Sequence, residues 1–517
     1  MTDTTAPAHR GAASVIGVTC LSTFVVNANT SAVSILLPSI SADLGAPIAM
    51  LQWAVTGYLL VGAATIVTTG ALGDVFGRRR LFVAGLVLFV ASCALIALAR
   101  VGEMVVIGRL IQGAAGAAIL ATGLCLLSVA TEGPARLRAV SLWGAASAAG
   151  AAAGPVVGGV LAEATGWQGL FWIDAVIAAI CIPWVLTTVG ESRDPDRPRS
   201  VDYAGTALVA AILAPFVFAV TMGSTWGWFS VATLGCLAIS VLATVGFVVV
   251  ERRVAAPLVD LALLRNIMLV GSTIAILIGA GAIAGLSFLI SLYFQDPSTF
   301  GMTSLQAGLA TLPLALVVIL TAPAITPLAN RFGGRPIVVA GFVLVTAGFV
   351  MLAFVRVSWS YLTFLPALLA IAVGLGLSNG PASSAATASV PPAQVGAASG
   401  ISNMARYVGG AVMTAVVAGI YASVNTEQLT GGVPAGEALA TALSRACIAL
   451  AVVSVLGIPL ARRAGRRGRP KAVELAAAAA ATSHTIPVTD EGIAAVAGGA
   501  GGAGGAGRSG QASGGVR

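Results

Sequence analysis

The sequence predicts an all-α polytopic membrane protein with fourteen transmembrane helices. Of its 517 residues, 58% are hydrophobic and 9% are charged, whereas roughly a quarter of a soluble domain is charged. The chain contains fourteen apolar segments that reach the ~20 residues needed to cross the hydrocarbon core of a bilayer as a helix. Its basic residues fall mainly in the short segments between them. Together these observations indicate that the chain folds within a lipid bilayer and not in water.

The expected spans follow one another with short connections. The first apolar run, from Gly11 to Pro38, is too long for the core of a signal peptide and has no convincing cleavage site, so it is expected to be the first span. In chain order, the fourteen expected spans are 12–37, 51–72, 80–99, 104–128, 138–162, 168–189, 202–221, 228–250, 267–294, 305–328, 335–355, 361–389, 396–422 and 438–461.

The distribution of basic residues predicts that both chain termini are cytoplasmic. With that orientation, the cytoplasmic segments up to residue 471 hold twenty arginine or lysine residues and the outer loops hold two, Arg100 and Arg356. Basic residues accumulate in cytoplasmic loops of membrane proteins, and one missed span would invert every later loop. These short loops suit anionic lipid headgroups, and nucleic acid is not an expected partner. Lys471 is the only lysine, and this bias, with the richness in Ala and Gly, indicates a GC-rich bacterial genome and hence a bacterial plasma membrane.

A segment early in the chain is repeated later. Residues 70–85 read GALGDVFGRRRLFVAG, and residues 326–341 read TPLANRFGGRPIVVAG. At a constant offset, the two share a Leu, a Phe, a Gly, an Arg and a final Val-Ala-Gly. A parallel internal repeat in a polytopic protein is typical of a transporter of two similar halves. Any two hairpin loops with Gly and Arg would also look partly alike, so that interpretation stays open.

The position of the repeat predicts the domain organisation. It follows the second and the tenth spans, which leaves spans seven and eight as a hairpin inserted between two six-helix bundles. The Ala- and Gly-rich end of the chain has few large apolar groups and is expected to be disordered. The expected parts are a cytoplasmic N-terminus at 1–11, the first bundle at 12–189, a cytoplasmic linker at 190–201, the hairpin at 202–250, a second cytoplasmic linker at 251–266, the second bundle at 267–461 and a cytoplasmic tail at 462–517.

Five segments resemble motifs of one transporter family. Residues 74–80 resemble motif A of the major facilitator superfamily, residues 109–117 (RLIQGAAGA) resemble its motif B, and residues 150–159 (GAAAGPVVGG) resemble its motif C, which is associated with antiporters. Residues 53–58 and 403–410 are similar to the fourteen-span drug:proton antiporter group. The resemblance covers nearly the whole membrane domain and implies the major-facilitator fold and proton-coupled drug export.

The resemblance assigns motif A to a cytoplasmic gate. Such a gate holds the two halves together on the inner side of the membrane. Its residues here would be Gly73, Asp74, Gly77, Arg78 and Arg79.

Motif C also has a physical interpretation. Gly150, Gly154 and Gly158 lie four residues apart, hence on one helix face, where they would let a neighbouring helix approach closely. Pro155 removes a backbone donor and favours a kink. With Gly159, these residues suit a rocking interface between the halves, or alternatively the ordinary packing of small residues.

Two arginines fall inside expected spans, where burial of a charge is costly. Arg109 is expected to face the interior with Gln112, almost one turn later, and the resemblance implies that it assists proton exchange near a central cavity. Arg406 has the same interpretation, with Asn403 three residues before it. Either arginine could instead extend to the membrane surface, Arg109 toward Glu103.

The acidic residues depart from the family pattern. Related exporters carry an aspartate in the first span, ahead of an Ala-Leu-Pro tripeptide, and the corresponding position here is Asn29. An amide cannot bind and release a proton at physiological pH, so that coupling site is missing. Asp174 is the best remaining carboxylate at membrane depth, either as the proton carrier or as an interfacial residue close to Trp172.

The first span also has a polar face. Asn27, Ser31 and Ser34 are spaced four and three residues apart and line one side of it, with Asn29 nearby. They suit a cavity that hydrogen-bonds an amphipathic solute, or else hydrogen bonds between helices.

The sequence argues against an enzyme and against a nucleotide-driven pump. It contains no Gly-Lys-Ser/Thr phosphate-binding loop. His9 and His484 lie in polar tails and the six cysteines form no Cys-x-x-Cys pair, so neither a metal site nor a cofactor is expected. The expected function is proton-coupled export of an amphipathic drug or antibiotic by a monomer, and the alternative is an importer of the same fold.

Overall fold

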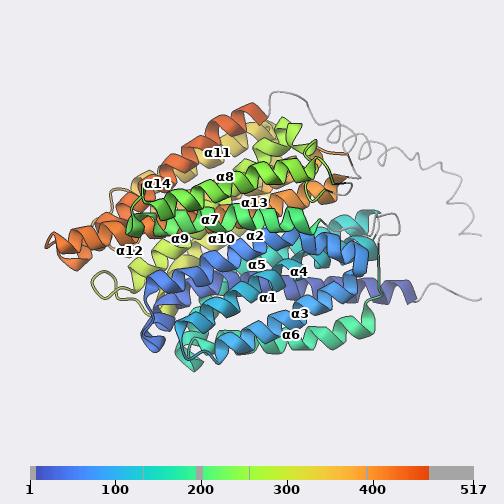
Figure 1. Cartoon of the computed structure of the whole chain (residues 1–517), viewed down its shortest axis with the longest axis horizontal. Coiled ribbons are helices and arrows are strands. Elements are labelled where there is room, and N and C mark those ends of the chain that lie inside the picture. The colour runs from blue at the N-terminus through green and yellow to red at the C-terminus, as the bar shows by residue number, and fades with distance from the viewer. Residues whose placement is uncertain (1–6, 132, 194–201, 255–256, 392–393, 465–517) are drawn as a thin grey trace, which may run out of the picture. The chain divides into compact units, whose positions relative to one another are not determined.

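The computed structural model describes residues 7–131, 133–193, 202–254, 257–391 and 394–464, which are mostly helical and contain no β-strand (Figure 1). A 3-10 helix, Leu263–Arg265, precedes α9. The α-helices are α1 (Pro7–Leu44), α2 (Ile48–Phe76), α3 (Arg78–Ala97), α4 (Gly102–Ala130), α5 (Gly133–Thr165), α6 (Gln168–Thr188), α7 (Tyr203–Trp226), α8 (Val231–Glu251), α9 (Ile267–Gln295), α10 (Ser304–Phe332), α11 (Gly334–Leu352), α12 (Tyr361–Ala388), α13 (Val395–Thr430) and α14 (Ala435–Ala464).

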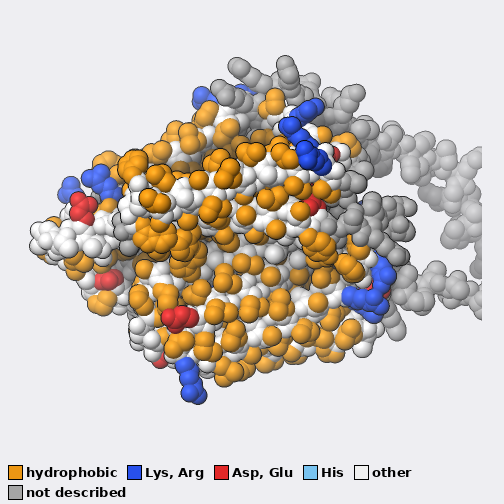
Figure 2. Space-filling model, in the orientation of Figure 1, with side chains coloured by type: hydrophobic (Ala, Val, Ile, Leu, Met, Phe, Trp, Pro, Cys, Tyr) orange, Lys and Arg blue, Asp and Glu red, His pale blue; other side chains and the backbone are white. Residues whose placement is uncertain are grey.

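All fourteen α-helices contain a stretch that is long and apolar enough to cross a membrane, which confirms the predicted spans. Many helices are longer than the segments expected for them: α1 has 38 residues and α13 has 36. The apolar pattern marks only the part of a helix that suits hydrocarbon, and a helix can continue into the interface. On the face shown in Figure 2, hydrophobic side chains cover the middle of the helices and charged side chains lie near their ends.

The helices form two six-helix bundles with the same internal packing. In the first bundle, α1 packs on α5, α2 on α4, and α3 on both α4 and α6. In the second bundle, α9 packs on α13, α10 on α12, and α11 on both α12 and α14. Each pair in the second bundle is a pair of the first bundle moved on by eight helices, as expected for an internal repeat interrupted by two inserted helices. The bundles meet through α2 with α13 and α5 with α10.

The two repeated loops make equivalent turns. Gly77 separates α2 from α3 with a φ of 116°, and Gly333 separates α10 from α11 with a φ of 86°. Positive φ values disfavour any residue with a Cβ atom, which explains glycine at both positions. The last glycine of each repeat lies at an equivalent helix contact. Gly85 of α3 lies against α4, and Gly341 of α11 lies against the backbone of Gly374 in α12.

The inserted hairpin packs beside the contact between the bundles. Helix α7 contacts both α2 and α13. The hydroxyl oxygens of Thr68 and Thr206 lie 2.5 Å apart, and the rings of Trp53 and Phe218 are 5.3 Å apart. Helix α8 packs on α7 and leaves apolar side chains such as Leu242 exposed, as suits a lipid-facing helix. Of the expected linkers and tail, residues 194–201, 255–256 and 465–517 lie outside the described residues.

Candidate transport site

A chain of three polar side chains crosses the centre of the first bundle. The amide Nδ2 of Asn29 (α1) donates to Oδ2 of Asp174 (α6) at 2.7 Å, and Nη1 of Arg109 (α4) donates to Oδ1 of Asn29 at 2.6 Å. Asn29 and Arg109 are 0% exposed, and Asp174 is 4% exposed. The single amide of Asn29 therefore joins a buried acid to a buried base that make no direct ion pair.

Arg109 is held from several sides inside the bundle. Its Nε donates to the carbonyl of Ala54 at 2.9 Å, and its Nη1 also donates to Oε1 of Gln112 at 2.5 Å. The ring centroid of Tyr58 lies 4.1 Å from the guanidinium carbon, a cation–π distance. The guanidinium thus faces the interior and does not extend toward Glu103, while its Nη2 has no hydrogen-bond partner among the described residues.

Small residues in α4 bring Tyr58 to this position. A side chain at Gly113 would collide with the backbone carbonyl of Tyr58, and a Cβ atom at Gly116 would lie 2.8 Å from the Tyr58 hydroxyl. Glycine therefore permits the close approach of α2 and α4. The hydroxyl of Thr30 donates to the hydroxyl of Tyr58 at 2.9 Å, which links the ring back to α1.

The other polar residues of α1 serve different contacts. Asn27 donates to the carbonyl of Thr23 on its own helix at 2.8 Å. Ser31 donates to the carbonyl of Asn27 at 3.0 Å and lies against Gly154 of α5. Ser34 is buried. The structure thus places Asn29 alone of these residues in the chain with Arg109 and Asp174.

The glycines of motif C face two neighbours. Gly150, Gly154 and Gly158 lie against the backbone of α1, so that a Cβ atom at Gly158 would be 2.9 Å from Cβ of Ala32. Gly159 faces the other bundle, where a Cβ atom would lie 2.6 Å from the carbonyl of Ser304 at the start of α10.

Pro155 belongs to the same contact between bundles. Its carbonyl packs against Gly308 of α10. The glycine stripe of α5 thus packs against α1 within the first bundle. Pro155 and Gly159 of the same helix pack against α10 of the second bundle.

The bundles are hydrogen-bonded to each other at the end of the molecule that carries the loop between α9 and α10. The hydroxyl of Ser291 donates to the carbonyl of Ser34 at 2.5 Å, and Gln295 donates to the carbonyl of Ile35 at 2.9 Å. The hydroxyl oxygens of Ser39 and Ser304 lie 2.8 Å apart. We call this the sealed end, and the end that carries the Gly77 and Gly333 turns the arginine-rich end.

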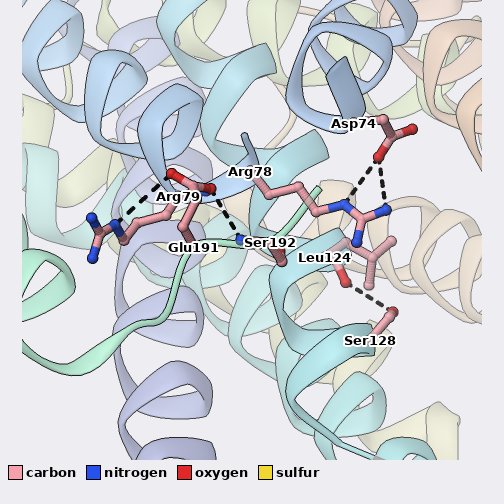
Figure 3. A network of polar contacts seen from close by, with 7 residues as sticks. All are labelled: Asp74, Arg78, Arg79, Leu124, Ser128, Glu191 and Ser192. Atoms are coloured by element: carbon pink, nitrogen blue, oxygen red, sulfur yellow. Dashed lines mark hydrogen bonds and ion pairs between the residues drawn. The ribbon is translucent and has the colours of Figure 1, made fainter. Parts of the chain in front are cut away.

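Motif A forms an ion-pair network at the arginine-rich end (Figure 3). Arg78 contacts Oδ1 of Asp74 through Nη2 at 2.9 Å and through Nε at 3.0 Å. The carboxylate of Glu191, just after α6, accepts from the backbone of Arg79 at 3.0 Å and lies 3.6 Å from Nε of Arg80. These contacts fasten the turn between α2 and α3 to the end of α6, within the first bundle.

Arg406 and Asn403 lie in the second bundle and do not touch the Arg109 chain. Nη2 of Arg406 donates to the hydroxyl of Ser383 in α12 at 3.4 Å, a long contact. The next residue, Tyr407, approaches the first bundle, where its ring centroid lies 6.4 Å from that of Tyr58.

Sequence reasoning missed several members of these networks. Tyr58 belongs to a segment that resembles the antiporter group, yet nothing in its spacing indicates a cation–π contact. Cys93 accepts from Gln112 at 3.0 Å, a contact that only the tertiary fold creates. Glu191 had a usable signal, because it is an acid in a linker that the charge distribution predicts to be on the same side of the membrane as Arg78, Arg79 and Arg80. Within the described ranges, no group of His, Cys, Asp and Glu is arranged to hold a metal ion.

Two repeated six-helix bundles, the first with a buried acid and a buried base joined by an amide, define a polytopic membrane transporter. The chain belongs to the Major Facilitator Superfamily, whose family model matches residues 19–414.

Its relatives include named exporters. The chain is 32% identical over 412 residues to the tetracenomycin C resistance and export protein of Streptomyces glaucescens, which covers 77% of this chain and 74% of the relative. It is 31% identical over 422 residues to the multidrug efflux pump LfrA of Mycolicibacterium smegmatis, with coverage of 81% and 82%. Its fold is similar to a solved structure of a POT peptide transporter with bound sulfate, at a TM-score of 0.65 and 16% identity, over 90% of this chain and 99% of that one.

Proposed function

We propose that this protein exports amphipathic small molecules from a bacterial cytoplasm in exchange for protons. The names of the relatives support the direction of transport and the kind of solute. The buried chain Asp174–Asn29–Arg109 supports the coupling and is the observation that carries the proposal.

Asp174 would be the proton carrier. As a carboxylate it accepts a charge-assisted hydrogen bond from Asn29, and such bonds are stronger than neutral ones. Protonation removes the negative charge and weakens that bond. The hydrogen bond that Asn29 accepts from Arg109 would weaken as a consequence. Asn29 cannot titrate in this range, so it would transmit the change from the acid to the base without carrying the proton.

The membrane arrangement completes the proposal. Both termini and the arginine-rich end would face the cytoplasm of the plasma membrane, in agreement with the positive-inside rule. The network of Asp74, Arg78 and Glu191 would then lie at the cytoplasmic entrance, and the sealed end would face outward. A single chain contains both bundles, so a monomer would suffice for transport.

Proton-driven transport in everted membrane vesicles tests this function. With an imposed pH gradient, wild-type vesicles should accumulate fluorescent amphipathic dyes, and an uncoupler should abolish the accumulation. Asp174→Asn and Arg109→Ala should each lower the rate at least tenfold at equal expression. Glu103→Gln, which neutralises an exposed acid outside the site, should retain the wild-type rate. Undiminished transport by Asp174→Asn, or transport indifferent to the uncoupler, would refute the coupling.

A further inference from the structure

A second arginine within a spanning helix, Arg406, has no ion-pair partner among the described residues. Arg406 lies nine residues after the start of the apolar stretch of α13 at Ala397, or about 14 Å along the helix. Its side chain is nevertheless exposed. An arginine this far along a spanning helix is expected to face water or the protein interior, so its exposed surface indicates that a solute can reach it. The adjacent Tyr407 lies near Tyr58 of α2, so Arg406 is next to the contact between the bundles.

The acids of the second bundle are all far from Arg406 along the chain. The sequence of α9–α14 and their loops contains three: Asp296 just after α9, Glu427 in the last turn of α13 and Glu437 in the first turn of α14, all at the sealed end. In the part of the chain that the structure describes, no carboxylate lies within ion-pair distance of Arg406. A guanidinium in this position gains from an anion supplied by something other than the protein.

Two side chains, one helical turn from Arg406 or from Ser383, have unused hydrogen-bonding atoms. Ser402 precedes it by one turn on the same face, is buried, and has a hydroxyl without a partner among the described residues. On α12, Asn379 precedes Ser383 by one turn, and its Oδ1 is likewise buried and unpartnered. Arg406 itself makes only the long 3.4 Å contact to Ser383.

Arg109 has more partners than Arg406 in the same protein. It donates to Ala54, Asn29 and Gln112 and lies over the ring of Tyr58, although its Nη2 has no partner among the described residues. The contrast indicates that the two arginines have different tasks. Arg109 belongs to an internal network, whereas Arg406 keeps its donors available.

We propose that Arg406, with Ser383, Ser402 and Asn379, binds an anionic group of the transported solute, a carboxylate or a phenolate. This inference rests on the proposed function, because it names the substrate class of the same transporter. A guanidinium offers paired donors that fit a carboxylate, a serine hydroxyl can add a further donor, and the amide oxygen of Asn379 can accept from a hydroxyl near the anionic group.

The test compares a fluorescent aromatic carboxylate with its methyl ester, which differ in one negative charge. Equilibrium binding to the purified full-length protein in detergent is measured for both probes, together with transport in the everted vesicles. Arg406→Gln should weaken carboxylate binding at least tenfold and leave ester binding within twofold. Arg406→Lys should recover part of the carboxylate affinity. Arg445→Gln removes the same charge from an exposed position in α14 and should change neither probe.

Three outcomes would overturn the inference. Equal losses of affinity for both probes in Arg406→Gln would assign Arg406 to structure or coupling. Unchanged affinity for both probes in that variant would place Arg406 outside the solute path. Failure of the wild-type protein to bind either probe would exclude this substrate class. Because binding is measured without a gradient, its result is separate from the proposed function. Proton-dependent transport of the ester alone would leave the exporter proposal standing while refuting the anion site.

Discussion

Asn29 is the residue on which the buried network depends. Among the described side chains, it alone is hydrogen-bonded to both Asp174 and Arg109, at 2.7 and 2.6 Å. An amide suits this place because it can donate to a carboxylate and accept from a guanidinium at once. An aspartate at the same position could accept from Arg109, but as a carboxylate it would repel Asp174.

Asn29→Ala is therefore expected to uncouple the two charged residues. It leaves a buried carboxylate without its donor, at an expected cost of about 1–3 kcal/mol in stability, and it should reduce proton-driven dye transport strongly. Asn27→Ala is the matched control, since Asn27 lies on the same helix and bonds only to the backbone of Thr23. Thermal unfolding in detergent and vesicle transport are measured for both variants. Similar behaviour of the two variants would contradict a bridging role for Asn29.

At the scale of helices, α5 is the element with two packing tasks. Its glycine stripe admits α1, and its Pro155–Gly159 segment contacts α10 of the other bundle. The stripe explains why small residues recur every four positions, because any side chain there would meet backbone atoms of α1. Motif C is thus interpretable in this protein both as close packing and as a contact between halves.

Gly154→Val should destabilise the protein, whereas Gly144→Val on the same helix should not. A Cβ atom at Gly154 would collide with the Ser31 hydroxyl and the carbonyl of Ala28, while one at Gly144 would meet nothing within 4 Å. Overpacking of this kind costs typically 1–3 kcal/mol, so about that loss is expected for Gly154→Val. The measurement is the midpoint of thermal unfolding for each purified variant. Equal midpoints for the two variants would show that α1 and α5 do not pack as described.

The helices themselves were predictable because each carries its own signal. A run of ~20 apolar residues indicates a span. A glycine close to arginines indicates each of the turns at Gly77 and Gly333. The network around Asn29 has no such local signal. Asp174 lies 145 residues from Asn29, and only the packing of α6 and α4 around α1 brings Asp174 and Arg109 to it. The sequence did single out all three residues, but it could not reveal that an amide joins them.

At the scale of the whole molecule, the repeat explains how two bundles can move against each other. The packing pairs of α1–α6 recur in α9–α14, so each bundle is held together by its own contacts. The contacts between bundles include three hydrogen bonds at the sealed end. In the orientation proposed above, the solute leaves at the sealed end, so that end has to open at some stage of transport.

A reversible crosslink across the sealed end should therefore stop transport. In the double variant Ser39→Cys/Ser304→Cys, the two sulfur atoms replace hydroxyl oxygens that lie 2.8 Å apart. Oxidation should form a disulfide between the bundles and abolish proton-driven dye accumulation in vesicles, and a reductant should restore it. Each single variant, treated in the same way, controls for the six native cysteines. Solute binding at Arg406 should survive the crosslink, because Arg406 lies 24 residues before Thr430, where α13 ends at the sealed end, or about 36 Å along the helix. Full transport by a quantitatively oxidised double variant would mean that the bundles need not separate at this end, and the alternating opening of the two ends would then be the wrong description of this transporter.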